Sequence, residues 1–369
     1  MLLAQNELGI FEIQEIEVNT PIQGKFNFCP EASKDSESIE YWLEDLLSLD
    51  IVKDIVSTKA FQRLYDISFL GALDYTHQSA SFLKKQYKSR AIHSIHVAAL
   101  ANYIAGARGY TAELKNHVIV AALLHDVGHA PLSHSVEPYI KKKIGYGHHQ
   151  AGEQIIRGEV SLAQDLKPIV RNHFDIDLLL SLIDGTAPKD FGGDLFYSPI
   201  NIDTIDGIAR SHTYLTGKQL TICRISVAKA AFCSEPSCDT RILDSFWKMK
   251  DRVYANLINN QFGLISDKSS EQFFRDQVSF CEGEIYSTER SWQQRYKHLF
   301  KSFSLLMREN TKPHWFGNEE FDFTKRTYYL RKEHLDHNRF ACDKEKKKIT
   351  ITECANNNHN SQIELPRLT

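Results

Sequence analysis

The stretch AALLHDVGHAPLSH, from Ala121 to His134, is the most informative part of the sequence. It begins as an apolar run that is typical of a buried helix, and it then supplies three histidines and an aspartate. Gly128 and Pro131 predict that the helix ends here, which places His125 and Asp126 at its C-terminal end. Imidazole and carboxylate groups are common metal ligands. The stretch therefore predicts a metal site at a helix end.

Histidines crowd around this stretch. The chain holds 16 histidines, and eight of them fall between residues 93 and 149, where an even distribution would place about two or three. Imidazole binds metals and carries protons near neutral pH. The crowding therefore favours a functional site over a set of ordinary core histidines.

Further ligands must come from elsewhere in the chain. His93 lies in the apolar helical segment that precedes the stretch, and the segment NIDTIDGIAR offers Asp203 and Asp206. Two imidazoles and two carboxylates suit a hard or borderline divalent ion with open coordination positions. On residue type alone, either aspartate completes the set.

The helical period dominates from about Ser38 to Phe280, where apolar residues recur at intervals of three and four. We expect one of these helices to end at Gly71 as its C-cap. The clearest predicted helices span residues 41–57, 59–71, 95–109, 113–128, 148–158, 175–185, 203–215 and 240–262.

The two ends of the chain have a different pattern. Residues 8–20 alternate apolar and polar side chains, and residues 347–355 form a second strand candidate. The predicted fold class is mainly α, a helical bundle with small β elements near the N- and C-termini. We expect an N-terminal extension over residues 1–49, a helical core over 50–284, and a mixed α/β extension with a frayed tail over 285–369.

Composition excludes several classes of protein. Lys and Arg number 44 against 47 Asp and Glu, a net charge of −3, so no overall field favours nucleic acid or a membrane surface. No apolar run approaches the roughly 18 residues that span a bilayer, and the N-terminus lacks the basic region of a signal peptide. Seven scattered cysteines do not form a disulfide framework. We expect a cytoplasmic protein.

These motifs resemble a known family. His93, the pair His125–Asp126 and Asp203 are similar to the signature of the HD-domain phosphohydrolases. The closest likeness is to the dNTP triphosphohydrolases, which include the dGTPase-like and sterile-alpha-motif/HD types. The stretch LLHDVGHAPLSHSVE resembles that family almost residue for residue. The segments at 55–77, 90–106 and 148–156 resemble its neighbouring helices, and the likeness covers roughly residues 50–262, weakening after 215.

The resemblance implies that the fold is an HD-domain helical bundle. It also implies roles for individual residues. One divalent metal ion (Mn, Mg, Fe, Ni or Zn) is expected, and it would polarise a phosphoryl oxygen and activate water. Asp206 is then expected to stabilise its helix or to support a ligand. A slip of the alignment by one residue would put His148 in the place of His149. The implied metal ligands are His93, His125, Asp126 and Asp203; the implied catalytic residues are His129, His134, Glu137 and His149; and the implied phosphate-binding residues are Arg90 and Arg63.

The sequence departs from the family where the family binds its nucleotide. Thr204, Gly207 and Ser211 stand where the family has Lys, Tyr and Asp, and Phe69 replaces a Gln that reads the deoxyribose. Tyr254 matches a later nucleotide-contacting Tyr only loosely. The metal chemistry is retained, whereas the identity of the substrate does not follow.

We therefore expect a divalent-metal-dependent phosphohydrolase that acts on a nucleotide. The resemblance favours a (d)NTP triphosphohydrolase that releases nucleoside and triphosphate. The departures keep two alternatives open: an HD phosphatase or phosphodiesterase that acts on another nucleotide, and a nucleotide-sensing regulator without catalysis. Relatives in the family often form homo-oligomers, so a homo-oligomer is expected, without a membrane or nucleic-acid partner.

Overall fold

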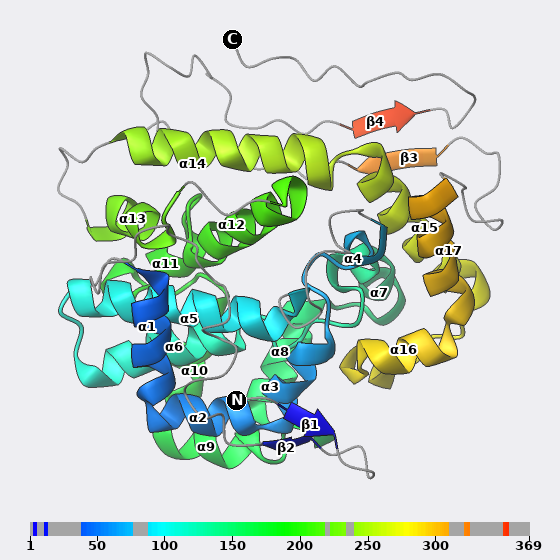
Figure 1. Ribbon diagram of the computed structural model, residues 1–369. Coiled ribbons are helices and arrows are strands. Elements are labelled where there is room, and N and C mark those ends of the chain that lie inside the picture. Colours follow the sequence, from blue (N-terminus) through cyan, green and yellow to red (C-terminus); the bar gives the residue numbers. More distant parts are fainter. Residues whose placement is uncertain are drawn as a thin grey trace.

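The computed structural model describes residues 3–5, 11–13, 38–76, 88–217, 222–233, 240–309, 321–324 and 350–353. The protein is mainly helical (Figure 1), which confirms that part of the predicted fold class. No helix among these residues is long and apolar enough to cross a membrane. The helices are α1 (Ile39–Ser48), α2 (Asp50–Ser57), α3 (Lys59–Arg63), α4 (Leu73–Thr76), α5 (Arg90–Ala107), α6 (Ala112–Leu124), α7 (Glu137–Ile144), α8 (His148–Arg157), α9 (Leu166–His173), α10 (Ile176–Ile183), α11 (Asp194–Tyr197), α12 (Ile202–Thr216), α13 (Arg224–Ala228), α14 (Thr240–Val253), α15 (Gln261–Gln277), α16 (Glu289–Arg295) and α17 (Lys297–Glu309).

Among the described residues, four short strands lie near the ends of the chain. Strand β1 (Leu3–Gln5) pairs antiparallel with β2 (Phe11–Ile13), and β3 (Phe321–Thr324) pairs antiparallel with β4 (Thr350–Glu353). Most of the predicted strand segments 8–20 and 347–355 lies outside the described residues, so the predicted β structure at the two ends stays a prediction.

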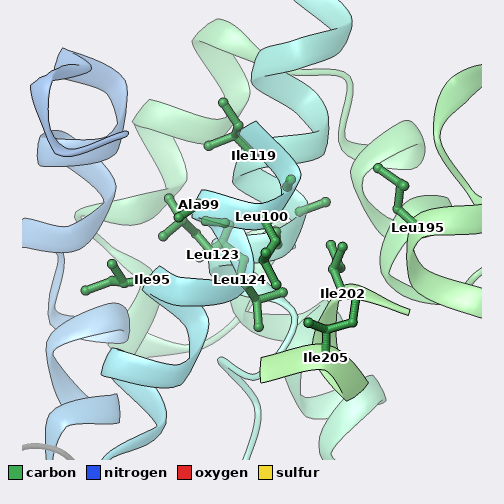
Figure 2. Packing of buried hydrophobic residues seen from close by; sticks show 14 of the residues in the cluster. Ile95, Ala99, Leu100, Ile119, Leu123, Leu124, Leu195, Ile202 and Ile205 are labelled. Carbon is green, nitrogen blue, oxygen red and sulfur yellow. The ribbon is translucent and has the colours of Figure 1, made fainter. Parts of the chain in front are cut away.

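Helices α5 and α6 form the centre of the core. They pack against each other, α5 also contacts α1 and α12, and α6 contacts α10. Small residues such as Ala99 let the helices approach, while Leu100 and Leu123 fill the space between them (Figure 2). Both helices are buried over most of their surface, as their nearly continuous apolar sequences predict.

Side-chain caps fix where three helices of the core begin. Ser89 Oγ accepts a hydrogen bond from Ile92 N at the start of α5, and Asn201 Oδ1 accepts one from Thr204 N at the start of α12. Thr111 caps α6 in the same way. Each cap satisfies a backbone N–H that has no partner within its own helix. These three helices carry, or end at, the four predicted metal ligands.

The prediction of one helix over residues 59–71 was wrong. Helix α3 ends at Arg63, one turn of 3-10 helix follows, and Ile67 is extended. The chain then pairs with the residues that precede α5, because Phe69 N donates to Lys88 O and Arg90 N donates to Ile67 O. These long-range backbone bonds replace the helical ones. Gly71 ends the segment in a turn with φ of +65°.

The C-terminal helices form a second apolar cluster with the region around residue 132. Phe274 and Trp292, from α15 and α16, share this cluster with Leu132 and Val136. Ile285 belongs to it as well, although a domain boundary was expected at 284/285. The boundaries stay a prediction, and the cluster places α15 and α16 behind the stretch that carries the histidines.

Candidate active site

The structure brings the four predicted metal ligands together. Helix α5 carries His93, the end of α6 carries His125 and Asp126, and the first turn of α12 carries Asp203. His93 Nε2 lies 2.9 Å from Asp203 Oδ1 and 3.7 Å from Asp126 Oδ2. His125 Nε2 lies 3.9 Å from Asp203 Oδ1. One ligand atom each from His93, His125 and Asp203 falls within 4.8 Å of the others.

The state of His125 shows that these residues fit a cation. Its Nδ1 donates to the carbonyl oxygen of Ala122 at 2.7 Å, so the lone pair is on Nε2. This Nε2 is buried and has no hydrogen-bond partner among the described residues, although Asp126 Oδ1 lies 3.6 Å away. A lone pair that faces carboxylates needs a positive charge between them, and a divalent ion supplies one.

Asp206 contacts the ring nitrogen of His93 that faces away from the predicted metal site. His93 Nδ1 lies 2.7 Å from Asp206 Oδ2, which leaves Nε2 directed at Asp203. Burial alone would lower the pKa of His93, but hydrogen bonds with these two aspartates raise it to about 9. The surroundings therefore favour positive charge at this point.

The two candidate aspartates of α12 have different environments. The side chain of Asp203 is 54% exposed and faces His93 and His125. The side chain of Asp206 is 0% exposed and forms ion pairs with Arg210 at 3.0 Å and Arg224 at 2.8 Å. This arrangement supports Asp203 as the ligand and gives Asp206 the supporting role that the sequence suggested.

A second group of histidines lies beside the first. His134 Nδ1 is 3.1 Å from Glu137 Oε2, and His148 Nδ1 is 2.5 Å from Glu137 Oε1. His129 Nε2 is 3.2 Å from Asp126 Oδ1, which connects the two groups. Burial would raise the pKa of Glu137, but its two histidine partners hold that pKa well below its usual range. Glu137 therefore orients both rings.

This second group is poorly arranged for a metal ion of its own. Nitrogens of His129, His134 and His148 lie within 4.8 Å of one another. However, the rings of His129 and His148 are stacked, with centroids 3.8 Å apart and planes 14° from parallel. The lone pair of a ring nitrogen lies in the ring plane, so two stacked rings do not converge on one ion. The group is better suited to hydrogen bonding and proton transfer.

His149, the histidine that the sequence placed in the site, lies beside this group. Its ring centroid is 4.4 Å from that of His148, and its Nδ1 is 3.4 Å from Asp184 Oδ1. Burial, together with the neighbouring His148, lowers its pKa. Both histidines line the same cavity, but His148 is the one that contacts Glu137 and His129. His148, the alternative if the alignment slips by one residue, therefore has closer contacts with the histidine group than His149 has.

The two predicted phosphate-binding arginines are in different places. Arg90 lines the cavity, and its Nη1 lies 2.5 Å from Asp126 Oδ2. Arg63 is buried, and its guanidinium donates to the carbonyl oxygens of Val127 and Ser287. These contacts use Arg63 to join distant segments of backbone. Arg63 is not among the described residues that line the cavity, so its phosphate role stays a prediction that these contacts do not support.

The cavity has a volume of about 340 Å³. Its charged and imidazole lining residues are Arg90, His125, Asp126, His129, His134, His148, His149 and Asp203. The other lining residues are Phe69, Leu70, Ile183, Phe196, Thr204, Gly207, Ile208, Ser211, Tyr254 and Ile258. Every position at which the sequence departs from the resembling family is among these other lining residues.

Phe69 lines the cavity and packs against His93. Its ring centroid is 4.6 Å from that of His93, and the guanidinium of Arg210 lies 5.6 Å from the ring. A Cβ added at Gly207 would lie 3.6 Å from Phe69 Cζ. A larger side chain at residue 207 and the ring of Phe69 would therefore compete for the same space.

Comparison with known proteins gives these residues a family. The family model described as HD domain matches residues 90–226, which include all four candidate ligands. Residues 90–226 form an HD domain. The structure outside this range adds α1–α4 before the HD domain and α14–α17 after it.

Curated relatives of the HD domain have related names. A Deoxynucleoside triphosphate triphosphohydrolase SAMHD1 homolog of Dictyostelium discoideum is 29% identical over 45% of this chain and 34% of its own length. A Deoxyguanosinetriphosphate triphosphohydrolase-like protein of Ruegeria is 34% identical over 28% of this chain and 24% of its own. An uncharacterized protein of Mycoplasma pneumoniae is 31% identical over 44% and 39%. The chain spans at most about two fifths of these relatives.

Gly128 lets two parts of the HD domain approach closely. It follows the His125–Asp126 pair, and a Cβ there would lie 2.0 Å from His148 O and 2.3 Å from Gly152 N. Both atoms belong to the backbone of the first turns of α8. The absence of a side chain at residue 128 therefore sets the distance between the two groups of histidines.

We expect Gly128→Ala to destabilise the HD domain by about 3 kcal/mol or more, because overlap with backbone atoms forces α8 to move. Gly152→Ala is the matched control. Its Cβ would meet Gly128 N at an ordinary 3.6 Å, so a change within about 1 kcal/mol is expected. Denaturant unfolding of both variants measures the difference. Equal stability of the two variants would contradict the close approach.

Sequence reasoning missed Ser133 and Glu289, and it named Phe69 only as a departure from the family. Ser133 Oγ accepts a hydrogen bond from Arg90 Nε at 2.7 Å, and Phe69 packs on His93. Glu289 accepts a hydrogen bond from Leu132 N. Ser133 and Phe69 each lie within a segment that resembles the family, and this position was a signal for their contacts. Glu289 carried no such signal, because it lies 157 residues from its partner Leu132.

Proposed function

We propose that this protein is a divalent-metal-dependent phosphohydrolase that acts on a nucleotide. The observation that carries the proposal is the convergence of His93, His125, Asp126 and Asp203, with an unpartnered buried nitrogen on His125. Bound there, a divalent ion supplies Lewis-acid activation of a phosphoryl group. The match to the HD domain and the names of the relatives support the same class of reaction.

We assign separate roles in phosphate binding, proton transfer and orientation to the residues around the proposed ion. We assign to Arg90 the binding of phosphate oxygens at the cavity wall, where it also orients Asp126. His134 is 41% exposed and is held by Glu137, so it is the histidine best placed to give a proton to the leaving oxygen. Burial and the charge of Arg90 lower the pKa of His129 well below its usual value. We therefore assign His129 an orienting role as a neutral ring.

For the substrate, we propose a (d)NTP and release of nucleoside and triphosphate. Support comes from the motif resemblance over residues 90–156 and from relatives that are named as triphosphohydrolases. In this assignment His148, or His149 beside it, contacts the phosphate chain together with His129 and His134. Homo-oligomeric assembly and a cytoplasmic location stay proposals of the same kind.

One observation favours a second candidate, a phosphatase or phosphodiesterase that acts on another nucleotide. Among the described residues that line the cavity, Arg90 is the only Lys or Arg. Its three guanidinium nitrogens already donate to Asp126, Ser133 and the carbonyl oxygen of Phe69. A triphosphate carries several negative charges, whereas this environment supplies counter-charge for about one phosphate group.

A product analysis separates the candidates. Purified protein with Mn²⁺ or Mg²⁺ is incubated with dNTPs, NTPs, nucleoside monophosphates and a cyclic dinucleotide, and the products are resolved by chromatography. Nucleoside with triphosphate supports the first proposal. Inorganic phosphate or a linearised dinucleotide supports the second. Binding without turnover of any compound would contradict both and favour a nucleotide sensor.

A further inference from the structure

The turn between His129 and His134 has an unfavourable backbone. Leu132 and Ser133 have φ of +59° and +46°, in the left-handed region that non-glycine residues rarely adopt. Such residues persist only when surrounding contacts hold them in place, and they cluster at functional sites. Arg90, within the HD domain, donates to Ser133 Oγ in this turn, and further contacts come from outside the HD domain.

Glu289, at the start of α16, contacts both the turn and Ser68. Its Oε2 accepts hydrogen bonds from Leu132 N at 3.0 Å, Ser68 N at 3.0 Å and Ser68 Oγ at 2.8 Å. Its Oε1 accepts one from the hydroxyl of Tyr75. The Glu289 side chain is buried, so water has little access to its carboxylate oxygens as a replacement for these donors.

Both segments that Glu289 holds lead to the metal ligands. Ser133 Oγ donates to Ser68 O and accepts from Arg90 Nε, each at 2.7 Å. The Nη1 of Arg90 then lies 2.5 Å from Asp126 Oδ2. The position of Asp126 therefore depends on Arg90, and the position of Arg90 depends on Ser133. Glu289 in turn binds Leu132, which precedes Ser133 in the chain, and Ser68, whose carbonyl oxygen accepts from Ser133 Oγ.

We propose that Glu289 is a positioning residue for the metal centre. It fixes Ser68 and Leu132, and through Ser133 and Arg90 it sets the orientation of the Asp126 carboxylate. The inference rests on the proposed function for the role of Asp126, but the link from Glu289 to the turn is independent of it. The HD domain alone lacks this residue, because Glu289 lies beyond residue 226.

The test compares Glu289→Gln with Glu284→Gln in the full chain. Glu284 is a buried glutamate five residues earlier that accepts hydrogen bonds from Tyr296 and Arg295 and does not contact Ser68 or Leu132 in the described structure. A glutamine at 289 keeps the shape, but its amide oxygen is a weaker acceptor than a carboxylate. Its amide nitrogen would also deprive the Tyr75 hydroxyl of an acceptor.

Two measurements are made on each variant. Hydrogen–deuterium exchange in peptides over 67–70 and 128–136 is expected to be about tenfold faster in Glu289→Gln and unchanged in Glu284→Gln. The affinity for Mn²⁺ is expected to fall about threefold to tenfold in Glu289→Gln only. This is less than the 10–100-fold typical of a direct partner of a ligand, because Glu289 acts through two further residues.

The outcomes distinguish this inference from the proposed function. Unchanged exchange in both peptides, or the same change in Glu284→Gln, would overturn the role of Glu289. Normal Mn²⁺ affinity in Glu289→Gln would overturn its link to Asp126. A wild-type protein that binds no Mn²⁺ would instead remove the proposed metal centre. If Glu289→Gln does not fold, Ser68→Ala removes one of the same hydrogen bonds and is expected to give a smaller effect of the same sign.

Discussion

Asp203→Ala is expected to reduce metal-dependent turnover by about 10³-fold or more while leaving the stability of the protein nearly unchanged. The carboxylate is one of the two proposed oxygen ligands, and Lewis-acid activation by a metal is worth several kcal/mol in the transition state. The side chain is 54% exposed, and its contacts are with His93 and His125, so little packing is lost. Turnover of the substrate found by product analysis, and the unfolding midpoint, are the two measurements.

Thr204→Ala is a suitable control for this prediction. Thr204 is the next residue on α12 and lines the same cavity, but it has no place in the proposed metal centre. It is expected to keep metal binding and to alter only the KM. An Asp203→Ala protein that retains both its Mn²⁺ affinity and its turnover would remove Asp203 from the ligand set.

Asp206→Ala, three residues further along α12, is expected to have the opposite pattern. Its removal leaves the guanidinium groups of Arg210 and Arg224 buried without their carboxylate, which is expected to cost about 3–5 kcal/mol of unfolding free energy. His93 also loses the partner of its Nδ1, so metal affinity is expected to fall about 10–100-fold. Denaturant unfolding and Mn²⁺ titration measure the two effects.

The Asp203→Ala and Asp206→Ala variants of α12 serve as controls for each other. If Asp206→Ala proved as stable as Asp203→Ala, the buried cluster around Asp206 would not be structured as described. If instead Asp203→Ala were strongly destabilised, its exposed position would be wrong. Only a large stability effect at 206 with a small one at 203 agrees with the structure.

Sequence alone predicted the central helices because they have local signals. The apolar run before His125 identifies a buried helix, and Gly128 marks its end. The segment around Asp203 shows a helical period, which α12 follows from Ile202. The family resemblance implied one metal site formed by His93, His125, Asp126 and Asp203. The structure places these four residues near one another, and their role as ligands stays a prediction.

Other features depended on contacts that no local pattern contains. Residues 67–69 leave the helical conformation because they pair with the chain before α5. The partners of Arg63 lie 64 and 224 residues away, so its contacts with two distant backbone segments could not be predicted from a local pattern. His148 and His149 are adjacent in sequence, so only the orientation of α8 decides which of them meets Glu137.

The stacking of His129 and His148 has a consequence for spectroscopy. With ring planes 14° from parallel and centroids 3.8 Å apart, the carbon-bound protons of each imidazole lie in the magnetic field of the other aromatic ring. Their resonances are displaced upfield while the two rings remain face to face. An anion that separates the rings removes this shielding, so isotope-labelled histidine provides a direct signal of cavity occupancy before any bond is broken.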